Sequence, residues 1–213
     1  MKLNEYIDHT NLNPTATKED IFILCEQAKK YCFHSVCVNP FWVKFAKNNL
    51  KNSGVLVACV IGFPLGANCT EIKVEEAKLA KSMGADELDM VINEGLFKMK
   101  DYNKVKEEID KICDVSSLPV KVIVETSKLS SEEIIEACKI VGESKAKFIK
   151  TSTGFIGDGA KLEDVKLMKK YLSNDKQIKA SGGIRDKETM IKFIQAGATR
   201  IGTSSGVKIM EDN

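Results

Sequence analysis

Short apolar runs of strand length alternate with helical segments along the chain, with few residues between them. The runs lie at 6–10, 34–39, 55–61, 87–92, 120–125, 146–150, 177–180 and 198–202. This alternation predicts parallel strands joined by right-handed crossovers, and eight such strands are typical of a closed barrel. The predicted fold class is therefore α/β, a (β/α)8 TIM barrel, with residues 1–213 forming a single domain.

The segments between these runs have helical patterns. The first begins with a capping box, Thr17-x-x-Asp20, and has apolar residues at 21, 24, 25 and 28. Further helices are expected at 70–83, 102–115, 130–141, 162–172 and 187–196, and one is expected to begin at Pro40. An open doubly wound sheet is the alternative, but Gly-x-Gly-x-x-Gly is missing after the first strand.

Composition excludes several classes of partner and compartment. The 213 residues carry a formal charge of +2, with no block of five like charges, so neither nucleic acid nor an anionic membrane surface is expected as a partner. The first residues lack the apolar region of a signal peptide, and we expect a soluble, cytoplasmic protein. Seven scattered cysteines without a Cys-x-x-Cys pair predict buried, reduced thiols and no metal site.

The stretch from Lys150 to Gly154 contains the most informative lysine. An apolar run ends at Lys150, and the small residues Thr-Ser-Thr-Gly follow it. That order predicts a buried strand with an amine at its carboxyl end, where barrel active sites lie, beside a loop that a ligand can approach closely. Only Arg185 and Arg200 of the 32 basic residues are arginine, so most lysines must lie on solvated helix faces.

Strand parity predicts which side chains enter the barrel, because residues two apart share a face. The valines at 120, 122 and 124 suit the helix-facing side, as do the apolar residues at 88, 90 and 92. The polar or aromatic side chains then placed inside are Asp8, Glu87, Asp89, Lys121, Glu125, Phe148, Lys150, Gln177 and Lys179. Burying an unpaired charge costs several kcal/mol, so these groups must be paired or functional.

Two inward lysines on neighbouring strands, Lys150 and Lys179, have a chemical consequence. A free lysine is neutral in only about one molecule in a few thousand at pH 7, and only the neutral amine attacks a carbonyl. A neighbouring ammonium and partial desolvation lower the pKa. One lysine can then act as nucleophile and the other as its electrostatic partner, while Asp89 moves protons through a bound water. This pattern predicts Schiff-base chemistry.

Glycine-rich segments follow the last two predicted strands. Gly182-Gly183 comes after Lys179, and Gly202-Thr203-Ser204-Ser205-Gly206 follows the final strand and opens a short helix. Loops in these positions bind phosphate in many such barrels through backbone N–H groups. Thr151 and Gly154 are further candidates for phosphate contacts. Ser204 or Ser205 could instead be a simple helix N-cap.

Seven motifs occur in an order that resembles the deoxyribose-phosphate aldolase family over nearly the whole chain. They are Asp8-His9-Thr10, Val36-Cys37-Val38-Asn39-Pro40, Ile61-Gly62-Phe63-Pro64-Leu65-Gly66, Glu87-Leu88-Asp89-Met90-Val91, Val122-Ile123-Val124-Glu125-Thr126, Lys150-Thr151-Ser152-Thr153-Gly154 and Lys179-Ala180-Ser181-Gly182-Gly183. The resemblance implies a class I aldolase of deoxyribose phosphate catabolism, which reversibly cleaves 2-deoxy-D-ribose 5-phosphate to acetaldehyde and D-glyceraldehyde 3-phosphate.

The resemblance also implies roles for individual residues and an assembly. Lys150 would form the Schiff base, Lys179 would lower its pKa, and Asp89 would be the acid and base working through water. A cytoplasmic homodimer without a cofactor is expected. The residues implied to bind phosphate are Gly154, Gly182, Gly183, Ser204 and Ser205, and those implied to line or support the site are Asp8, Thr10, Cys37 and Glu125.

Two departures from the family pattern stand out. Phe155 occupies a position at which some members have a lysine, so phosphate would depend more on backbone amides. The chain ends at Met210-Glu211-Asp212-Asn213, without the terminal tyrosine that assists proton transfer in some members. Three other interpretations compete: a transaldolase-like or hexose-phosphate aldolase, a non-catalytic sugar-phosphate binder, and a thiol-rich structural protein. A binder would have no reason to keep Lys150, Lys179 and Asp89 together.

Overall fold

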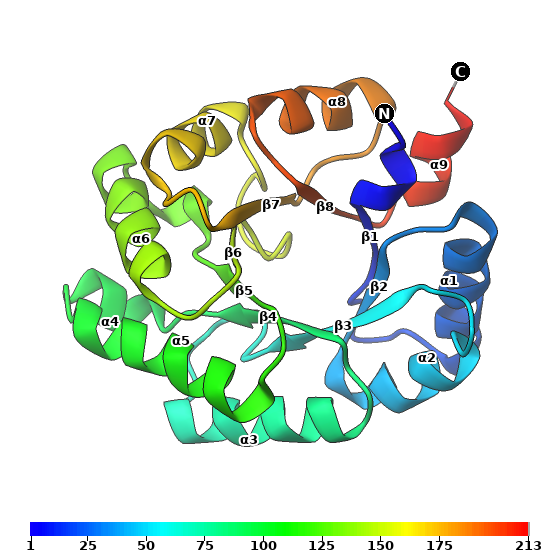
Figure 1. The fold of residues 1–213 in the computed structure, drawn as a ribbon, viewed down its shortest axis with the longest axis horizontal. Helices are drawn as coiled ribbons and strands as arrows, with labels where there is room; N and C mark the ends of the chain where they lie inside the picture. The colour runs from blue at the N-terminus through cyan, green and yellow to red at the C-terminus, as the bar shows by residue number, and fades with distance from the viewer. Residues whose placement is uncertain (213) are drawn as a thin grey trace.

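Eight parallel strands close into a barrel in the computed structural model, which describes residues 1–212 (Figure 1). Each strand pairs with the next in the chain, and β8 pairs with β1, which confirms the predicted (β/α)8 barrel. Asn213, the last residue of the tail considered above, lies outside the described residues. The strands are β1 (Ile7–Asn11), β2 (Ser35–Val38), β3 (Leu56–Ile61), β4 (Glu87–Val91), β5 (Val120–Ile123), β6 (Phe148–Lys150), β7 (Gln177–Ser181) and β8 (Arg200–Thr203).

The helices surround the barrel, as Figure 1 shows. They are α1 (Lys18–Tyr31), α2 (Val43–Asn49), α3 (Thr70–Ser82), α4 (Glu94–Lys98), α5 (Tyr102–Ser116), α6 (Ser131–Glu143), α7 (Leu162–Tyr171), α8 (Lys187–Ala196) and α9 (Gly206–Glu211). Short 3-10 helices occupy Leu3–Tyr6, Pro40–Trp42 and Thr126–Lys128.

Two helical details differ from the sequence prediction. The segment opening at Pro40 is a 3-10 turn that leads into α2, rather than the first turn of one helix. Helix α4 was not predicted, because five residues are too few to show a helical period. The side chain of Asn93 accepts a hydrogen bond from the backbone N–H of Leu96, and this cap starts α4.

The main hydrophobic core lies between the strands and the helices. Leu88 and Met90 of β4, and Val120 and Val122 of β5, are fully buried there, as strand parity predicted. A smaller apolar cluster inside the barrel consists of Leu12, Cys37, Ala58 and Val60. Strands β2 and β3 and the β1–α1 connection thus contribute apolar groups to the interior, whereas most of the charged side chains come from β4 to β8, together with Asp8 of β1.

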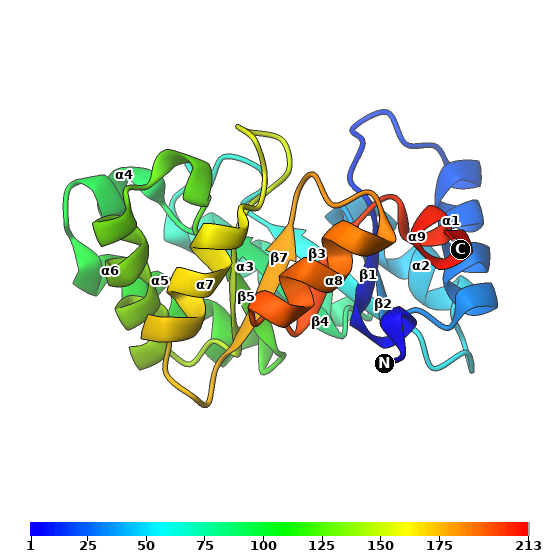
Figure 2. The ribbon, with the colours of Figure 1, turned by 90° about the horizontal axis from the view of Figure 1, so that it is seen from above.

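The register brings the polar residues of neighbouring strands side by side. Lys150 of β6 is the Cα partner of Lys179 in β7, and Asp89 of β4 is the partner of Lys121 in β5. The connections that follow β1, β6 and β7 extend beyond the same end of the barrel (Figure 2). These are carboxyl ends of parallel strands, where barrel active sites lie. Within residues 1–212, no helix is both long and apolar enough to cross a bilayer.

Candidate active site

Seven charged side chains contact one another inside the barrel. Each residue is at most 7% exposed, so solvent screens their interactions little. The cations come from β5 to β8 and the carboxylates from β1 and β4. The seven are Asp8, Glu87, Asp89, Lys121, Lys150, Lys179 and Arg200.

Lys150 ends β6, and its Nζ lies 2.7 Å from Asp89 Oδ2. Burial lowers the pKa of this amine and the ammonium of Lys179 lowers it further, while Asp89 opposes both effects. The net direction is downward, which increases the neutral fraction at neutral pH. Lys150 therefore has the property that a nucleophilic amine requires.

Lys179 lies in a different environment. Its Nζ donates to Asp8 Oδ2 and, at 2.7 Å, to Asp89 Oδ2. Burial disfavours its charged form, but these two carboxylates outweigh burial and raise the pKa of Lys179. Gly202 in β8 makes room for this side chain, because a Cβ there would lie 3.1 Å from Lys179 Cε. Lys179 is therefore a permanent ammonium next to Lys150.

Asp89 connects the three interior lysines. Its Oδ1 lies 2.8 Å from Lys121 Nζ, and its Oδ2 accepts from both Lys150 and Lys179. Burial alone would raise the pKa of Asp89, but the charges of these three lysines hold it well below its usual range. Asp89 is therefore ionised and can accept a proton that passes through the site.

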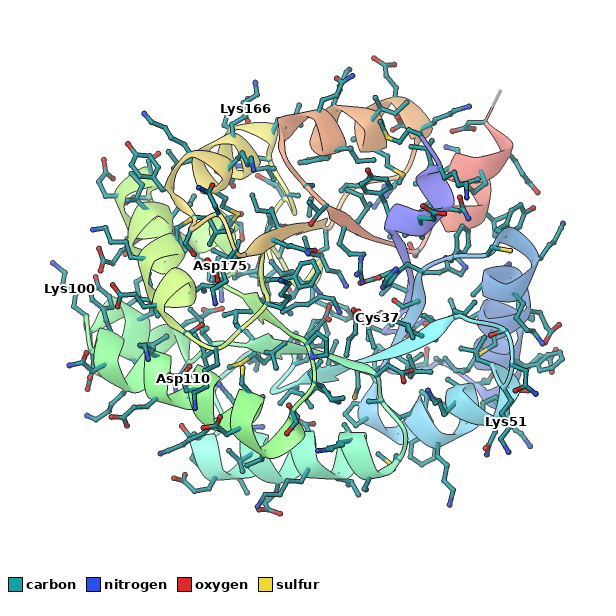
Figure 3. All side chains as sticks on the ribbon, in the orientation of Figure 1. Cys37, Lys51, Lys100, Asp110, Lys166 and Asp175 are labelled. Carbon is teal, nitrogen blue, oxygen red and sulfur yellow. The ribbon has the colours of Figure 1, made fainter. Side chains whose placement is uncertain are left out.

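Cys37 faces the interior from β2, and Figure 3 places it close to the centre of the barrel. Its residue is fully buried. Burial, followed by the charge of Asp89, raises the pKa of the thiol to about 11. Cys37 consequently stays protonated at neutral pH and contributes an uncharged wall to the site.

A cavity of about 620 Å³ opens at the carboxyl ends of the strands. Among the three interior lysines, Lys150 lines this cavity, whereas Lys121 and Lys179 do not. Most of its wall comes from the end of β1, from the β1–α1, β6–α7 and β7–α8 connections and from the end of β8, including Thr10, Gly154, Gly182, Gly183, Arg185 and Ser204.

The glycine loops on one side of the cavity are packed backbone against backbone. Gly182 has φ +87°, and a Cβ there would lie 2.8 Å from the Cα of Gly159. Any side chain at this position would therefore push the β6–α7 and β7–α8 connections apart. Their close contact therefore requires glycine at this position.

Glu125 holds the loop that follows Lys150. It lies two residues after the end of β5, is fully buried and has a left-handed backbone at φ +51°. Its Oε2 accepts hydrogen bonds from the backbone N–H of Thr153 at 3.1 Å and from the Thr153 hydroxyl. The Thr153 Oγ1 in turn accepts from the backbone N–H of Phe155 at 3.1 Å. These bonds fix the conformation of the loop that carries Gly154.

The remaining predicted site residues lie at or behind the cavity. Thr10 and Ser204 line it, while Asp8 and Cys37 lie deeper. The Thr151 hydroxyl is buried and donates to the backbone carbonyl of Ser181, so it supports the loop and does not line the cavity. Ser205 is the N-cap residue of α9, and its side chain makes no capping bond.

Two candidate functional residues, Arg200 and Arg185, were not predicted from the sequence. Arg200 is the first residue of β8, and the alternation of Arg200, Ile201 and Gly202 would have placed it inside had parity been applied to this strand. Arg185 is exposed and lines the cavity two residues after the Gly182-Gly183 pair. Its position in a loop gave no periodic signal, although the scarcity of arginine in the chain could have drawn attention to it.

Within residues 1–212, no group of three or more His, Cys, Asp or Glu side chains is arranged to hold a metal ion. The polar residues that line the cavity include Lys150, Arg185, His9, Asp20 and several hydroxyl and carboxamide residues.

The fold and site define a class of protein: a (β/α)8 barrel in which a buried lysine of lowered pKa lines a cavity, an arrangement suited to imine chemistry. The chain belongs to the DeoC/LacD family of aldolases, whose sequence model matches residues 3–212.

Individual relatives agree with this assignment. A deoxyribose-phosphate aldolase of Thermococcus kodakarensis is 55% identical over 99% of this chain and 96% of its own length. One of Clostridium botulinum is 54% identical over 99% of this chain and 100% of its own. The tetrameric deoxyribose phosphate aldolase of Aeropyrum pernix superposes with a TM-score of 0.92 at 32% identity, over 98% of this chain and 89% of that one.

Proposed function

We propose that this chain is a class I aldolase that reversibly cleaves 2-deoxy-D-ribose 5-phosphate to acetaldehyde and D-glyceraldehyde 3-phosphate. The observation that carries the mechanism is that Lys150 alone among the three interior lysines lines the cavity. Lys150 is also the one whose amine has a lowered pKa. Access and protonation state thus select the same residue as nucleophile.

The reaction begins when the Lys150 lone pair attacks the C1 aldehyde of the open-chain sugar. The carbonyl oxygen takes a proton, and the carbinolamine then loses water to give an iminium ion. Asp89 lies 2.7 Å from the amine and supports these proton transfers through a water molecule. Lys179 keeps its charge throughout, which disfavours protonation of the neighbouring amine.

Cleavage follows from the electron demand of the iminium ion. A water held by Asp89 removes the proton of the C3 hydroxyl, the C2–C3 bond breaks, and its electron pair forms an enamine on the C1–C2 fragment. Glyceraldehyde 3-phosphate leaves, C2 takes up a proton, and hydrolysis of the imine releases acetaldehyde and the free amine. All steps use the lysine, water and Asp89, so the reaction needs no cofactor.

The phosphate group binds at the opposite end of the cavity from Lys150. Gly154, Gly182, Gly183 and Ser204 line the cavity, and their backbone N–H groups would bind the phosphate oxygens. Arg185 adds a guanidinium at the same edge. Phe155, which carries no charge, lines the same cavity, so Arg185 supplies a positive charge that Phe155 does not.

Borohydride trapping tests the proposed mechanism. Acetaldehyde followed by borohydride will add one ethyl group to Lys150, and peptide mass mapping will locate it. A Lys150→Arg chain will lose both this label and the cleavage of 2-deoxyribose 5-phosphate, whereas a Lys147→Gln control, altered at a neighbouring exposed position, will keep both. A label elsewhere, or none in the folded protein, would exclude Lys150 as nucleophile.

The proposal includes a compartment and an assembly. All seven cysteines are free, which suits a reducing cytoplasm. A homodimer would cover exposed apolar side chains such as Phe41, which is 80% exposed beside Trp42. Sedimentation of the purified protein distinguishes the dimer from a monomer or a tetramer.

A further inference from the structure

The charges of the seven contacting side chains inside the barrel are not balanced. Three carboxylates, Asp8, Glu87 and Asp89, face four cations, Lys121, Lys150, Lys179 and Arg200. Glu125 is also buried, but its carboxylate bonds to Thr153 and Ser127, outside this cluster. Full ionisation would leave the cluster with one excess positive charge on side chains that solvent hardly reaches. An unpaired buried charge is costly, so the cation with the weakest ionic partners is expected to lose its proton.

Contact distances identify that cation. Lys121 Nζ lies 2.6 Å from Glu87 Oε2 and 2.8 Å from Asp89 Oδ1, and Lys179 contacts both Asp8 and Asp89. The one carboxylate oxygen that Lys150 contacts is Asp89 Oδ2, which Lys179 also holds. Lys150 is therefore the surplus cation of the interior.

Arg200 creates this surplus from outside the cavity. Its Nη1 lies 2.9 Å from Asp8 Oδ1 and 2.9 Å from Glu87 Oε2. The guanidinium occupies one oxygen of Asp8, and Lys179 takes the other. Arg200 itself always stays charged, because Asp8 and Glu87 outweigh burial and raise its pKa further. Since Arg200 does not line the cavity, it has no direct access to substrate.

We propose that Arg200 and Glu87 are a positioning pair that sets the protonation state of Lys150: Arg200 supplies the excess charge that Lys150 relieves by releasing its proton. This inference rests on the proposed role of Lys150 in imine formation. Arg200 and Glu87 lie at the amino-terminal ends of β8 and β4. They would favour the neutral amine of Lys150 in addition to the effect of the neighbouring Lys179 ammonium.

The other groups around Lys150 do not supply the same effect. Cys37 on β2 is protonated, and the interior residues Ala58 and Val60 of β3 are apolar. His34 lies outside the sealed region, with its Nε2 3.6 Å from Glu87 Oε1 and its side chain 31% exposed. Lys121 is held charged because Asp89 and Asp8 outweigh the effect of burial on its pKa.

Charge-changing variants test the proposal through the pH dependence of acetaldehyde trapping at Lys150. Arg200→Gln removes the surplus charge, so the pH of half-maximal labelling will rise by about one unit. Arg200→Lys keeps the charge and will retain the wild-type pH profile. Lys147→Gln removes an exposed charge next to β6 and will also leave the profile unchanged.

The double variant Glu87→Gln/Arg200→Gln separates charge balance from structural damage. It removes one charge of each sign, so the excess of one cation is kept and the wild-type profile should return, even if the rate is lower. It also leaves no unpaired carboxylate where Glu87 was. If Arg200→Gln fails to fold, Glu87→Gln replaces it as the single variant. Its pH of half-maximal labelling should be lower than in the wild-type chain, and the double variant should return it to the wild-type value.

Two results would overturn the proposal: a profile for Arg200→Gln that matches Lys147→Gln, or a double variant displaced as far as the single one. Either result with normal labelling of the wild-type Lys150 leaves the aldolase mechanism intact. Absence of labelling at Lys150 in the wild-type chain would instead reject the proposed function itself.

Discussion

Lys150 and Lys179 donate to the same atom, Oδ2 of Asp89, each from 2.7 Å. The two amines differ because Lys179 has a second carboxylate partner, Asp8, while Lys150 instead faces the cavity. Although both amines bind the same oxygen, the pKa of Lys179 is raised and the pKa of Lys150 is lowered.

Replacing Lys179 by leucine should raise the pKa of Lys150. The substitution removes the adjacent ammonium, and an increase of about two units would leave about one hundredth of the neutral amine at neutral pH. Cleavage of 2-deoxyribose 5-phosphate should slow accordingly and recover partly in alkaline buffer. Lys166→Leu, at an exposed position of α7, is the control, and circular dichroism checks the fold. An unchanged pH–rate profile would restrict Lys179 to a structural role.

Removing the hydroxyl of Thr153 should weaken substrate binding at its phosphate end. Thr153→Val keeps the shape of the side chain but removes the hydroxyl that Glu125 and the backbone N–H of Phe155 bind. Leaving such buried groups unpaired costs about 1–3 kcal/mol, so KM for the phosphorylated sugar should rise roughly tenfold. Unphosphorylated deoxyribose is the comparison substrate, and an equal loss with both sugars would contradict this role.

Phe155→Lys should improve binding of the phosphorylated substrate. Phe155 is 50% exposed at the cavity and makes an edge contact with Phe63, at 5.1 Å between ring centroids. A lysine here adds a cation beside the phosphate loops, and KM should fall severalfold at low ionic strength. The gain should shrink in about 0.5 M salt, because salt screens exposed charges. Phe155→Met removes the ring without adding charge and should show no such salt-dependent gain.

Acid should destabilise the barrel through its interior carboxylates. Burial alone would raise the pKa of Glu87, but the nearby His34, Lys121 and Arg200 lower it from 4.5 to about 2. The folded state then binds this proton less readily than the unfolded chain. The stabilisation from Glu87 is therefore complete above about pH 5 and lost as the pH falls from about 4.5 towards 2.

Urea unfolding at pH 7, 5, 4 and 3 measures this dependence. The wild-type midpoint should fall steeply below pH 5, and Glu87→Gln should start lower but decline less. Asp8 and Asp89 have lowered pKa values too, so some decline will remain in the variant. If the urea midpoints of the wild-type chain and of Glu87→Gln fell equally with pH, Glu87 would not contribute to acid sensitivity.

Strand periodicity explains why so much of the site could be predicted. Residues two apart share a face, so the placement of Asp89, Lys121, Lys150 and Lys179 inside the barrel followed once the strands were recognised. Which of these side chains form ion pairs with one another could not be predicted from the sequence, because those contacts depend on the stagger of the strands around the barrel. That Lys179 contacts Asp8 across the β8–β1 closure is a property of the three-dimensional register.

The loops were harder to predict, because their conformations depend on contacts with other loops. Glycine content identified the β7–α8 connection, but it gave no indication that Gly182 packs on Gly159. Thr151 illustrates the same limit, since its hydroxyl turns to the carbonyl of Ser181 and away from the cavity. Residue type predicted hydrogen bonding there but could not predict the partner.

The packing of Gly182 against Gly159 also determines where the pocket can be enlarged. Side chains cannot be shortened at positions that have none, and the two backbones cannot move closer together. Space for bulkier aldehydes can instead be made where side chains line the cavity, as Ile23, Leu24 and Gln27 of α1 do. Libraries that vary α1 should broaden substrate scope, while those that vary the glycine loops should mainly yield inactive catalysts.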